Sequence, residues 1–97
     1  MIFILIINIK FKDKEDMEYF INNFLILQKY CLDKEKDFLL QYEYAISDKN
    51  KNKIIIIEKY KNKDAYLNIH RKSKQFLNFK ENIKNLNLII DGESFTI

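Results

Sequence analysis

The segment Lys53–Phe79, KIIIIEKYKNKDAYLNIHRKSKQFLNF, decides the fold of this chain. Four consecutive isoleucines, Ile54–Ile57, form a run that is too short and too β-branched for a helix, so it predicts a buried strand. Asn62 is a suitable N-cap, and residues after it recur at the three-and-four spacing of one helical face: Tyr66, Ile69, His70, Ser73, Phe76 and Leu77. The segment therefore predicts a strand followed by an amphipathic helix that carries the only histidine.

The N-terminal segment Ile2–Phe11 predicts a second strand that is apolar on both faces. Its odd positions from Phe3 to Phe11 form one face, while Ile2, Ile4 and Ile6 lie on the other. Helices of so small a chain can cover only one face of a sheet. We therefore expect the second face to pack against the sheet of a second subunit.

A long helix is predicted between these strands. Asp13 with Asp16 resembles a capping box, and an apolar stripe runs from Met17 to Cys31. The stretch Leu32–Asp37 is rich in charge and is predicted to be a loop, after which Phe38–Ile46 alternates as a half-exposed strand with Leu40 and Tyr42 on the same side.

The remaining connections complete the pattern. Ser47–Asn52 predicts a hairpin connection, and the second helix is expected to extend to Ile83 or Lys84. Leu86–Ile90 predicts a last strand, and Gly92 predicts a turn or bulge before the C-terminal residues 94–97.

The element order β-α-β-β-α-β predicts an α+β, ferredoxin-like fold in one domain, residues 1–97. Two β-α-β halves give a four-stranded antiparallel sheet in which the first and third strands are adjacent in the centre. These are the two most apolar strands, as central burial requires. Together with the apolar second face, this arrangement predicts a homodimer.

The composition excludes several classes of function. The 17 basic and 14 acidic residues give a net charge of +3 with no dense basic block, which gives little reason to expect a nucleic-acid partner. Cys31 is the only cysteine, so no internal disulfide or cysteine-cluster metal site is expected. Ile2–Ile7 is too short to span a bilayer, so we expect no membrane partner and a cytoplasmic location.

The fold alone does not define the function. An RNA-recognition module would need aromatic residues on its central strands, and the isoleucine strand has none. An acylphosphatase-like site would need a loop rich in glycine and arginine, and none is present. The remaining use of the fold is a cavity between helices and sheet that binds a small organic molecule.

The central segment resembles the antibiotic biosynthesis monooxygenase family, the dimeric α+β barrel proteins that include quinol monooxygenases. The resemblance rests on Glu58-x-Tyr60, on Lys63-Asp64-Ala65-Tyr66, and on His70, Ser73, Phe76 and Phe79. Tyr60 stands where the family often has tryptophan, and Ile56 where some members have asparagine. Phe79 occupies the position of the iron-binding histidine of the haem-degrading branch, so haem degradation is not expected.

The resemblance implies oxygenation of a quinol or similar phenol without a metal or other cofactor. His70 is then the candidate base, Tyr66 and Tyr60 would orient the aromatic ring, and Asn8 would donate to a developing oxyanion. Glu58 would hold the histidine or a water molecule.

Ser73 and Phe76 complete the expected binding site. The alternative is a non-catalytic homodimer of the same fold that binds a small molecule or serves as an interaction module.

Overall fold

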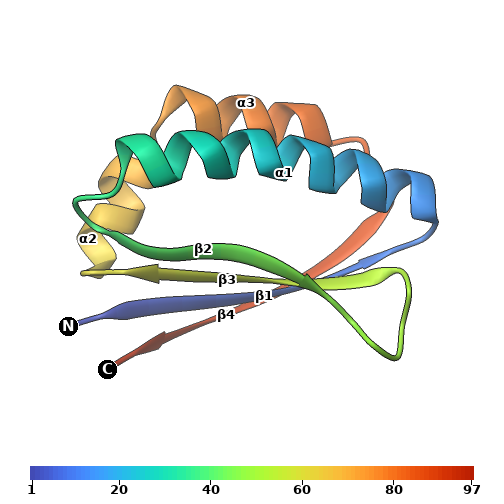
Figure 1. Ribbon diagram of the computed structural model, residues 1–97, viewed down its shortest axis with the longest axis horizontal. Coiled ribbons are helices and arrows are strands. Elements are labelled where there is room, and N and C mark those ends of the chain that lie inside the picture. Colours follow the sequence, from blue (N-terminus) through green and yellow to red (C-terminus); the bar gives the residue numbers. More distant parts are fainter.

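A four-stranded antiparallel sheet with helices on one face forms the structure, a computed structural model that describes all 97 residues (Figure 1). The strands are β1 (Phe3–Phe11), β2 (Leu39–Ile46), β3 (Lys53–Tyr60) and β4 (Leu88–Thr96). The helices are α1 (Lys14–Lys34), α2 (Lys63–Ala65), the π-helix η1 (Tyr66–His70) and α3 (Lys74–Ile83). The strand order β2-β3-β1-β4 confirms the predicted ferredoxin-like fold, with β1 and β3 in the centre.

The central strands supply the floor of the core. In the antiparallel register of β1 and β3, Ile9 lies opposite Ile54 and Phe3 lies opposite Tyr60, and all four side chains are buried on the helix side. Isoleucine runs favour this position because β-branched side chains pack well on the pleated surface of a sheet.

Helix α1 begins where the sequence predicts. The side chain of Asp13 accepts a hydrogen bond from the backbone N–H of Asp16 at 2.9 Å, which satisfies one of the free donors of the first turn. The apolar stripe is buried against the sheet: Met17, Phe20, Phe24, Leu27 and Cys31. Edge-to-face contacts of Phe20 with Phe11 and with Phe79, both 5.3 Å between ring centroids, join α1 to β1 and α3.

Two predictions for the region after Cys31 are wrong. Helix α1 continues to Lys34 rather than ending in a charged loop from Leu32, and Glu35 forms its C-cap. A β-bulge between Leu39 and Gln41 changes the side-chain alternation of β2, so Leu39 joins the core with Tyr42 while Leu40 is exposed. The extra residue of a bulge moves every preceding side chain to the other face, which regular alternation does not predict.

The predicted second helix is divided into three pieces. Asn62 caps α2 as predicted, with its side chain accepting from the N–H of Ala65 at 2.8 Å. The chain then forms the π-helix η1 and a turn, and a new helix, α3, begins after Ser73. The Ser73 hydroxyl accepts from the N–H of Phe76 at 3.1 Å, so Ser73 is the N-cap of α3.

Strand β4 contains no turn. The prediction that Gly92 marks a turn or bulge is wrong, because β4 pairs with β1 without a break and Gly92 lies opposite Ile7. Gly92 has no positive φ angle, so its backbone is ordinary strand.

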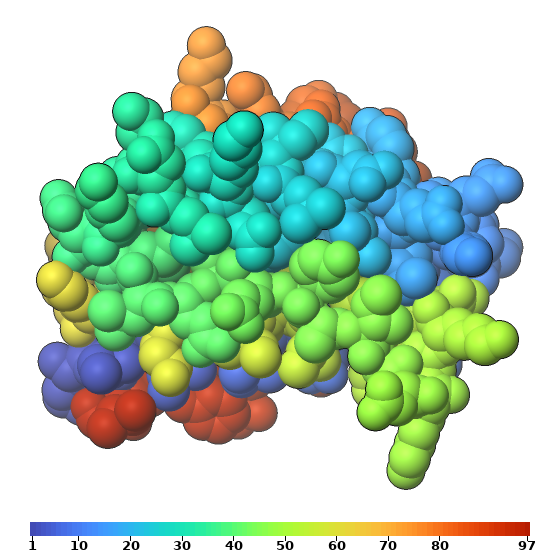
Figure 2. Space-filling view, in the orientation of Figure 1, coloured from blue at the N-terminus to red at the C-terminus, as the bar shows by residue number.

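The face of the sheet opposite the helices is apolar in its centre. Half-buried isoleucines of β1 and β3 form this outer face: Ile4, Ile6, Ile55 and Ile57. Charged residues of the edge strands, such as Glu43 opposite Ile57 and Glu93 opposite Ile6, flank them. The β2–β3 hairpin projects from the body of the molecule (Figure 2). None of the helices has the length and apolar character needed to cross a membrane.

Candidate active site

A cavity of about 350 Å³ lies between the helix side of the sheet and the helices. Eleven of its 14 lining residues are hydrophobic. Aromatic side chains from α1, β2, η1 and α3 form much of its wall: Phe20, Phe24, Tyr42, Tyr66, Phe76 and Phe79. An aromatic-walled cavity of this volume fits a planar organic molecule of one or two rings.

Glu58 is the only acidic residue in the cavity wall. It lies on β3 with 5% of its surface exposed, and its Oε1 accepts a hydrogen bond from the Tyr60 hydroxyl at 2.6 Å. Burial raises the pKa of Glu58 above its usual range, although the Tyr60 hydrogen bond and the nearby His70 oppose this shift. A carboxyl group with a raised pKa beside a cavity is suited to accept a proton from a bound molecule.

Two cations lie at the solvent edge of the cavity. Arg71 follows η1 and its guanidinium carbon lies 5.9 Å from the centre of the Tyr66 ring. The Nζ of Lys80 on α3 lies 5.9 Å from the centre of the Phe76 ring. Both side chains line the cavity and both residues are exposed, so they provide positive charge where a ligand would enter.

Tyr42 and Tyr66 are the two tyrosines of the cavity wall. Burial, together with the charge of Glu58, raises the pKa of both phenols. Both tyrosines therefore stay protonated at neutral pH and can donate hydrogen bonds to a ligand oxygen.

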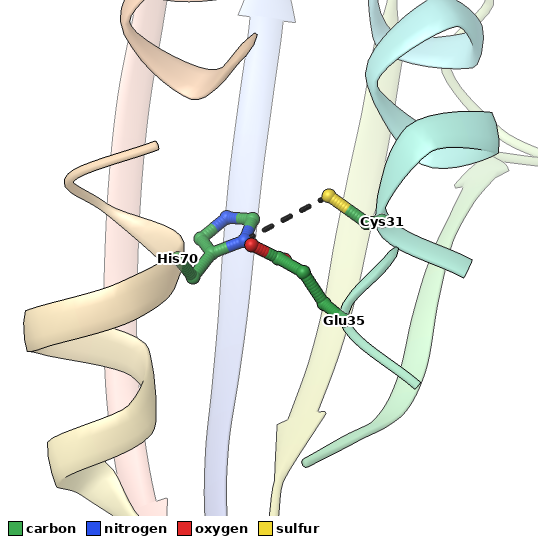
Figure 3. A group of neighbouring side chains, drawn as sticks. All are labelled: Cys31, Glu35 and His70. Carbon is green, nitrogen blue, oxygen red and sulfur yellow. Dashed lines mark hydrogen bonds and ion pairs between the residues drawn. The ribbon is translucent and has the colours of Figure 1, made fainter. Parts of the chain in front are cut away.

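His70 does not line the cavity. Its side chain is completely buried, and its Nδ1 lies 2.7 Å from Glu35 Oε1 and 3.8 Å from Cys31 Sγ (Figure 3). The imidazole ring packs behind the wall, with centroid distances of 5.0 Å to Phe76 and 5.2 Å to Tyr42. His70 is thus separated from any ligand in the cavity by one layer of aromatic rings.

The π-helix determines this position. Tyr66–His70 is a single wide turn, so the backbone N–H of Arg71 bonds to the carbonyl of Tyr66, five residues earlier. One added residue per turn rotates His70 relative to a regular helix. The predicted helical face assumes 3.6 residues per turn, whereas the actual turn directs His70 toward Glu35.

The structure brings together only part of the predicted site. Glu58, Tyr66 and Phe76 line the cavity. Tyr60 is fully buried behind Glu58, to which it donates its hydrogen bond. The hydroxyl of Ser73 is engaged as a helix cap.

Asn8 lies on the outer face of the sheet, since it pairs with Ile55 of β3 and Asp91 of β4. The sheet therefore separates Asn8 from the cavity. The structure does not place this amide where it would meet an oxyanion formed under the helices.

Glu35 is the residue that sequence reasoning missed. It falls in the predicted charged loop, yet it has 2% of its surface exposed and forms the hydrogen bond with His70. The sequence does contain a signal for it, because Glu35 follows Cys31 by four residues and so continues the buried stripe of α1 by one more turn.

Several solved structures share this fold. A protein of unknown function from Bacteroides thetaiotaomicron, described as a possible oxidoreductase, superimposes with a TM-score of 0.84 at 20% identity, covering 99% of this chain and 97% of that chain. A Nitrosomonas europaea protein provisionally named an antibiotic biosynthesis monooxygenase gives a TM-score of 0.86 at 11% identity, with coverages of 99% and 89%. SnoaB from Streptomyces nogalater, a cofactor-independent oxygenase, gives 0.80 at 11% identity, with coverages of 99% and 92%.

At these identities the structural likeness establishes the fold alone. A comparison with curated proteins found no sequence match. The family model described as antibiotic biosynthesis monooxygenase matches residues 2–82, which is most of the chain. The protein therefore belongs to the antibiotic biosynthesis monooxygenase family.

Proposed function

We propose that the protein is a monooxygenase that oxidises a quinol or similar electron-rich phenol without a resident cofactor. The observation that carries this proposal is the aromatic-walled cavity of about 350 Å³ with one buried carboxyl group, Glu58, in its wall. Family membership supports an oxygenase, and the relative SnoaB is described as a cofactor-independent oxygenase.

The chemistry needs a substrate that is itself the reductant. A quinol and O₂ give a hydroxyquinone and water, so one oxygen atom enters the ring and the other leaves as water with the electrons of the substrate. The protein has to remove a phenolic proton, hold the resulting anion and keep water from the reacting carbon. The mostly hydrophobic lining disfavours water inside the cavity, and Tyr42 and Tyr66 in its wall would donate to the anion.

Glu58 is placed better than His70 to act as the base. The Glu58 carboxyl group belongs to the cavity wall, while the His70 ring lies behind it and its Nδ1 already contacts Glu35. A general base has to reach the proton that it removes, within about 3 Å or through one water molecule. We therefore assign proton abstraction to Glu58, with Tyr60 holding its carboxyl group in place.

Oxygen uptake tests this proposal. Wild-type protein and Glu58→Gln are compared on a panel of hydroquinones of one and two rings, with Glu18→Gln as the control because Glu18 is exposed on α1 and does not line the cavity. We expect Glu58→Gln to lose roughly 10²- to 10⁴-fold in rate and Glu18→Gln to match wild type. Loss of uptake in His70→Asn with full uptake in a folded Glu58→Gln would return the base to His70.

A non-catalytic binding module is the second candidate, because the base predicted from the sequence does not reach the cavity. This function predicts that a quinone quenches the fluorescence of the cavity tyrosines in a saturable way while no hydroquinone gives oxygen uptake above that of buffer. Quenching without uptake would support the binding module and contradict the oxygenase.

We also propose that two copies pair through the outer face. Its half-buried isoleucines would lose their contact with water in such a pairing, which favours association. Light scattering is expected to give twice the chain mass of 11.8 kDa, and Ile57→Lys is expected to give the monomer mass. Ile26→Lys is the matched control, since Ile26 is 74% exposed on α1; a dimer that persists in Ile57→Lys would rule out this face.

A further inference from the structure

A second group of reactive side chains lies apart from the cavity and has no part in the proposed reaction. Cys31, Glu35 and His70 are each at least 98% buried, and one ligand atom from each lies within 4.8 Å of the others. Figure 3 shows the Cys31 sulfur and the Glu35 carboxyl group directed toward the same edge of the imidazole ring. None of the three residues lines the cavity.

The local structure explains why these side chains meet. Cys31 is in the last turn of α1, and the backbone N–H of Glu35 donates to the Cys31 carbonyl at 2.9 Å. Side chains four residues apart lie on the same helical face, so sulfur and carboxylate point to the same side. The π-helix η1 brings His70 to them from a segment 35 residues later in the chain.

The cluster contains more polar capacity than the protein uses. Glu35 Oε1 and His70 Nδ1 bond to each other at 2.7 Å, but Glu35 Oε2 and His70 Nε2 are buried without a hydrogen-bond partner. They are the only buried side-chain nitrogen or oxygen atoms without a partner in the chain. Buried polar atoms are nearly always paired, so the unpaired Oε2 of Glu35, whose carboxyl group is directed at the cluster, indicates a site for a ligand. The other unpaired atom, His70 Nε2, lies on the opposite side of the ring from Nδ1 and takes no part in this site.

We propose that Cys31, Glu35 and His70 bind one divalent cation of the zinc class. Sulfur, imidazole nitrogen and carboxylate oxygen are the donors that Zn²⁺ takes in proteins. A thiolate and a carboxylate together neutralise the charge of the ion, which lowers the free-energy cost of burying it in an apolar core.

The separations fit a shared ion after a small movement. Two ligands of one tetrahedral zinc, at about 2.3 Å for sulfur and about 2.0 Å for nitrogen, are about 3.5 Å apart, and Cys31 Sγ lies 3.8 Å from His70 Nδ1. The oxygen and nitrogen ligands of such an ion are about 3.3 Å apart, so the contact between Glu35 and His70 at 2.7 Å has to open. A water molecule would complete the coordination.

The bound ion would have a structural role. It would connect the C-terminal end of α1 to the end of η1, two segments far apart in the sequence, without contact to the cavity. The three ligands are brought together only by folding, so the ion binds the folded chain and not the unfolded one. Such binding stabilises the folded chain.

Cobalt(II) titration of the full chain, freed of any histidine tag, tests the site. Cys31 is the only cysteine, so a thiolate-to-cobalt absorption band can arise from no other residue. We expect one cobalt ion per chain with this band, and displacement of the ion by Zn²⁺. We also expect a higher melting temperature with Zn²⁺ than with a chelator.

Two variants and one control make the result decisive. Cys31→Ser is expected to lose the band, and Glu35→Gln is expected to need at least about tenfold more cobalt to develop it; both should bind Zn²⁺ at least about tenfold more weakly, while Asp33→Asn, an exposed neighbour, binds as wild type does. X-ray absorption of the zinc-loaded wild type should show one sulfur ligand, and this readout does not depend on the folding of a variant. Absence of the band in folded wild type, or zinc stabilisation that both variants retain, would overturn the proposal.

Discussion

Two buried carboxylates in the same core, Glu58 and Glu35, have opposite surroundings. Glu58 belongs to a cavity wall and has one fixed partner, the Tyr60 hydroxyl. Glu35 is sealed away from the cavity and contacts His70. Burial alone therefore does not mark a catalytic carboxyl group: the group also has to face a space that a substrate can fill.

A shared aromatic layer separates the two sites. Tyr42 and Phe76 line the cavity with one side and contact the His70 ring with the other. The buried cluster of Cys31, Glu35 and His70 therefore packs against the side of these rings that faces away from the cavity. Substitutions in the buried cluster should mainly change the free energy of unfolding, and substitutions beside Glu58 should mainly change the rate of oxygen uptake.

Glu35→Ala is expected to have the largest effect on stability. The substitution removes the carboxylate partner of the buried Nδ1 of His70 and leaves it only the weak contact to Cys31 Sγ at 3.8 Å, which costs about 3 kcal/mol of unfolding free energy. Urea denaturation in the presence of a chelator measures this loss. Asp33→Ala is the control, because its ion pair with Lys34 is exposed and contributes less than about 1 kcal/mol. Equal stability of the two variants would contradict a structural role for Glu35.

Tyr60→Phe is expected to have a smaller effect that links stability to chemistry. Loss of the hydroxyl leaves Glu58 Oε1 unpaired, at a cost of about 1–2 kcal/mol. The lost hydrogen bond had stabilised the ionised carboxylate, so its removal raises the pKa of Glu58 further. The rising limb of the pH profile of oxygen uptake should move to higher pH, and an unmoved limb would show that Glu58 is not the titrating base.

Glu58→Gln is expected to have the smallest effect on stability, and the effect should depend on pH. Burial raises the pKa of Glu58 in the folded chain above its usual value of 4.5, so the folded state binds this proton more tightly than the unfolded state does. The stability that this tighter proton binding contributes is fully present below pH 4.5. It is lost as the pH rises through the pKa of Glu58 in the folded state.

The amide that replaces the carboxyl group in this variant does not titrate. The melting temperature of Glu58→Gln relative to wild type should therefore increase as pH rises above 4.5, measured at several pH values with one buffer series. A difference that stays constant with pH would show that burial does not raise the pKa of this carboxyl group.

Regular patterns in the sequence predicted the framework correctly. The alternating positions of β1, the isoleucine run of β3, the stripe of α1 and the caps at Asp13 and Asn62 all appear in the structure. These features depend on neighbours within a few residues, so local sequence contains the information.

Departures from regular patterns were not predicted. The bulge in β2, the π-helix Tyr66–His70 and the unbroken strand at Gly92 each deviate from the simplest local rule. In each case packing against another element outweighs local propensity, which is weak by comparison.

The sequence by itself determined the order of the elements, the central position of β1 and β3, and the membership of Glu58, Tyr66 and Phe76 in a candidate site. Only the tertiary structure decided that His70 faces Glu35 instead of the cavity. It also decided that Asn8 lies on the opposite side of the sheet from the cavity and from His70. The physical reason is distance along the chain, because the residues that contact His70, Glu35 and Cys31, precede it by 35 and 39 positions. The one added residue in the π-helical turn sets the direction of the His70 side chain, and a regular helical pattern does not predict it.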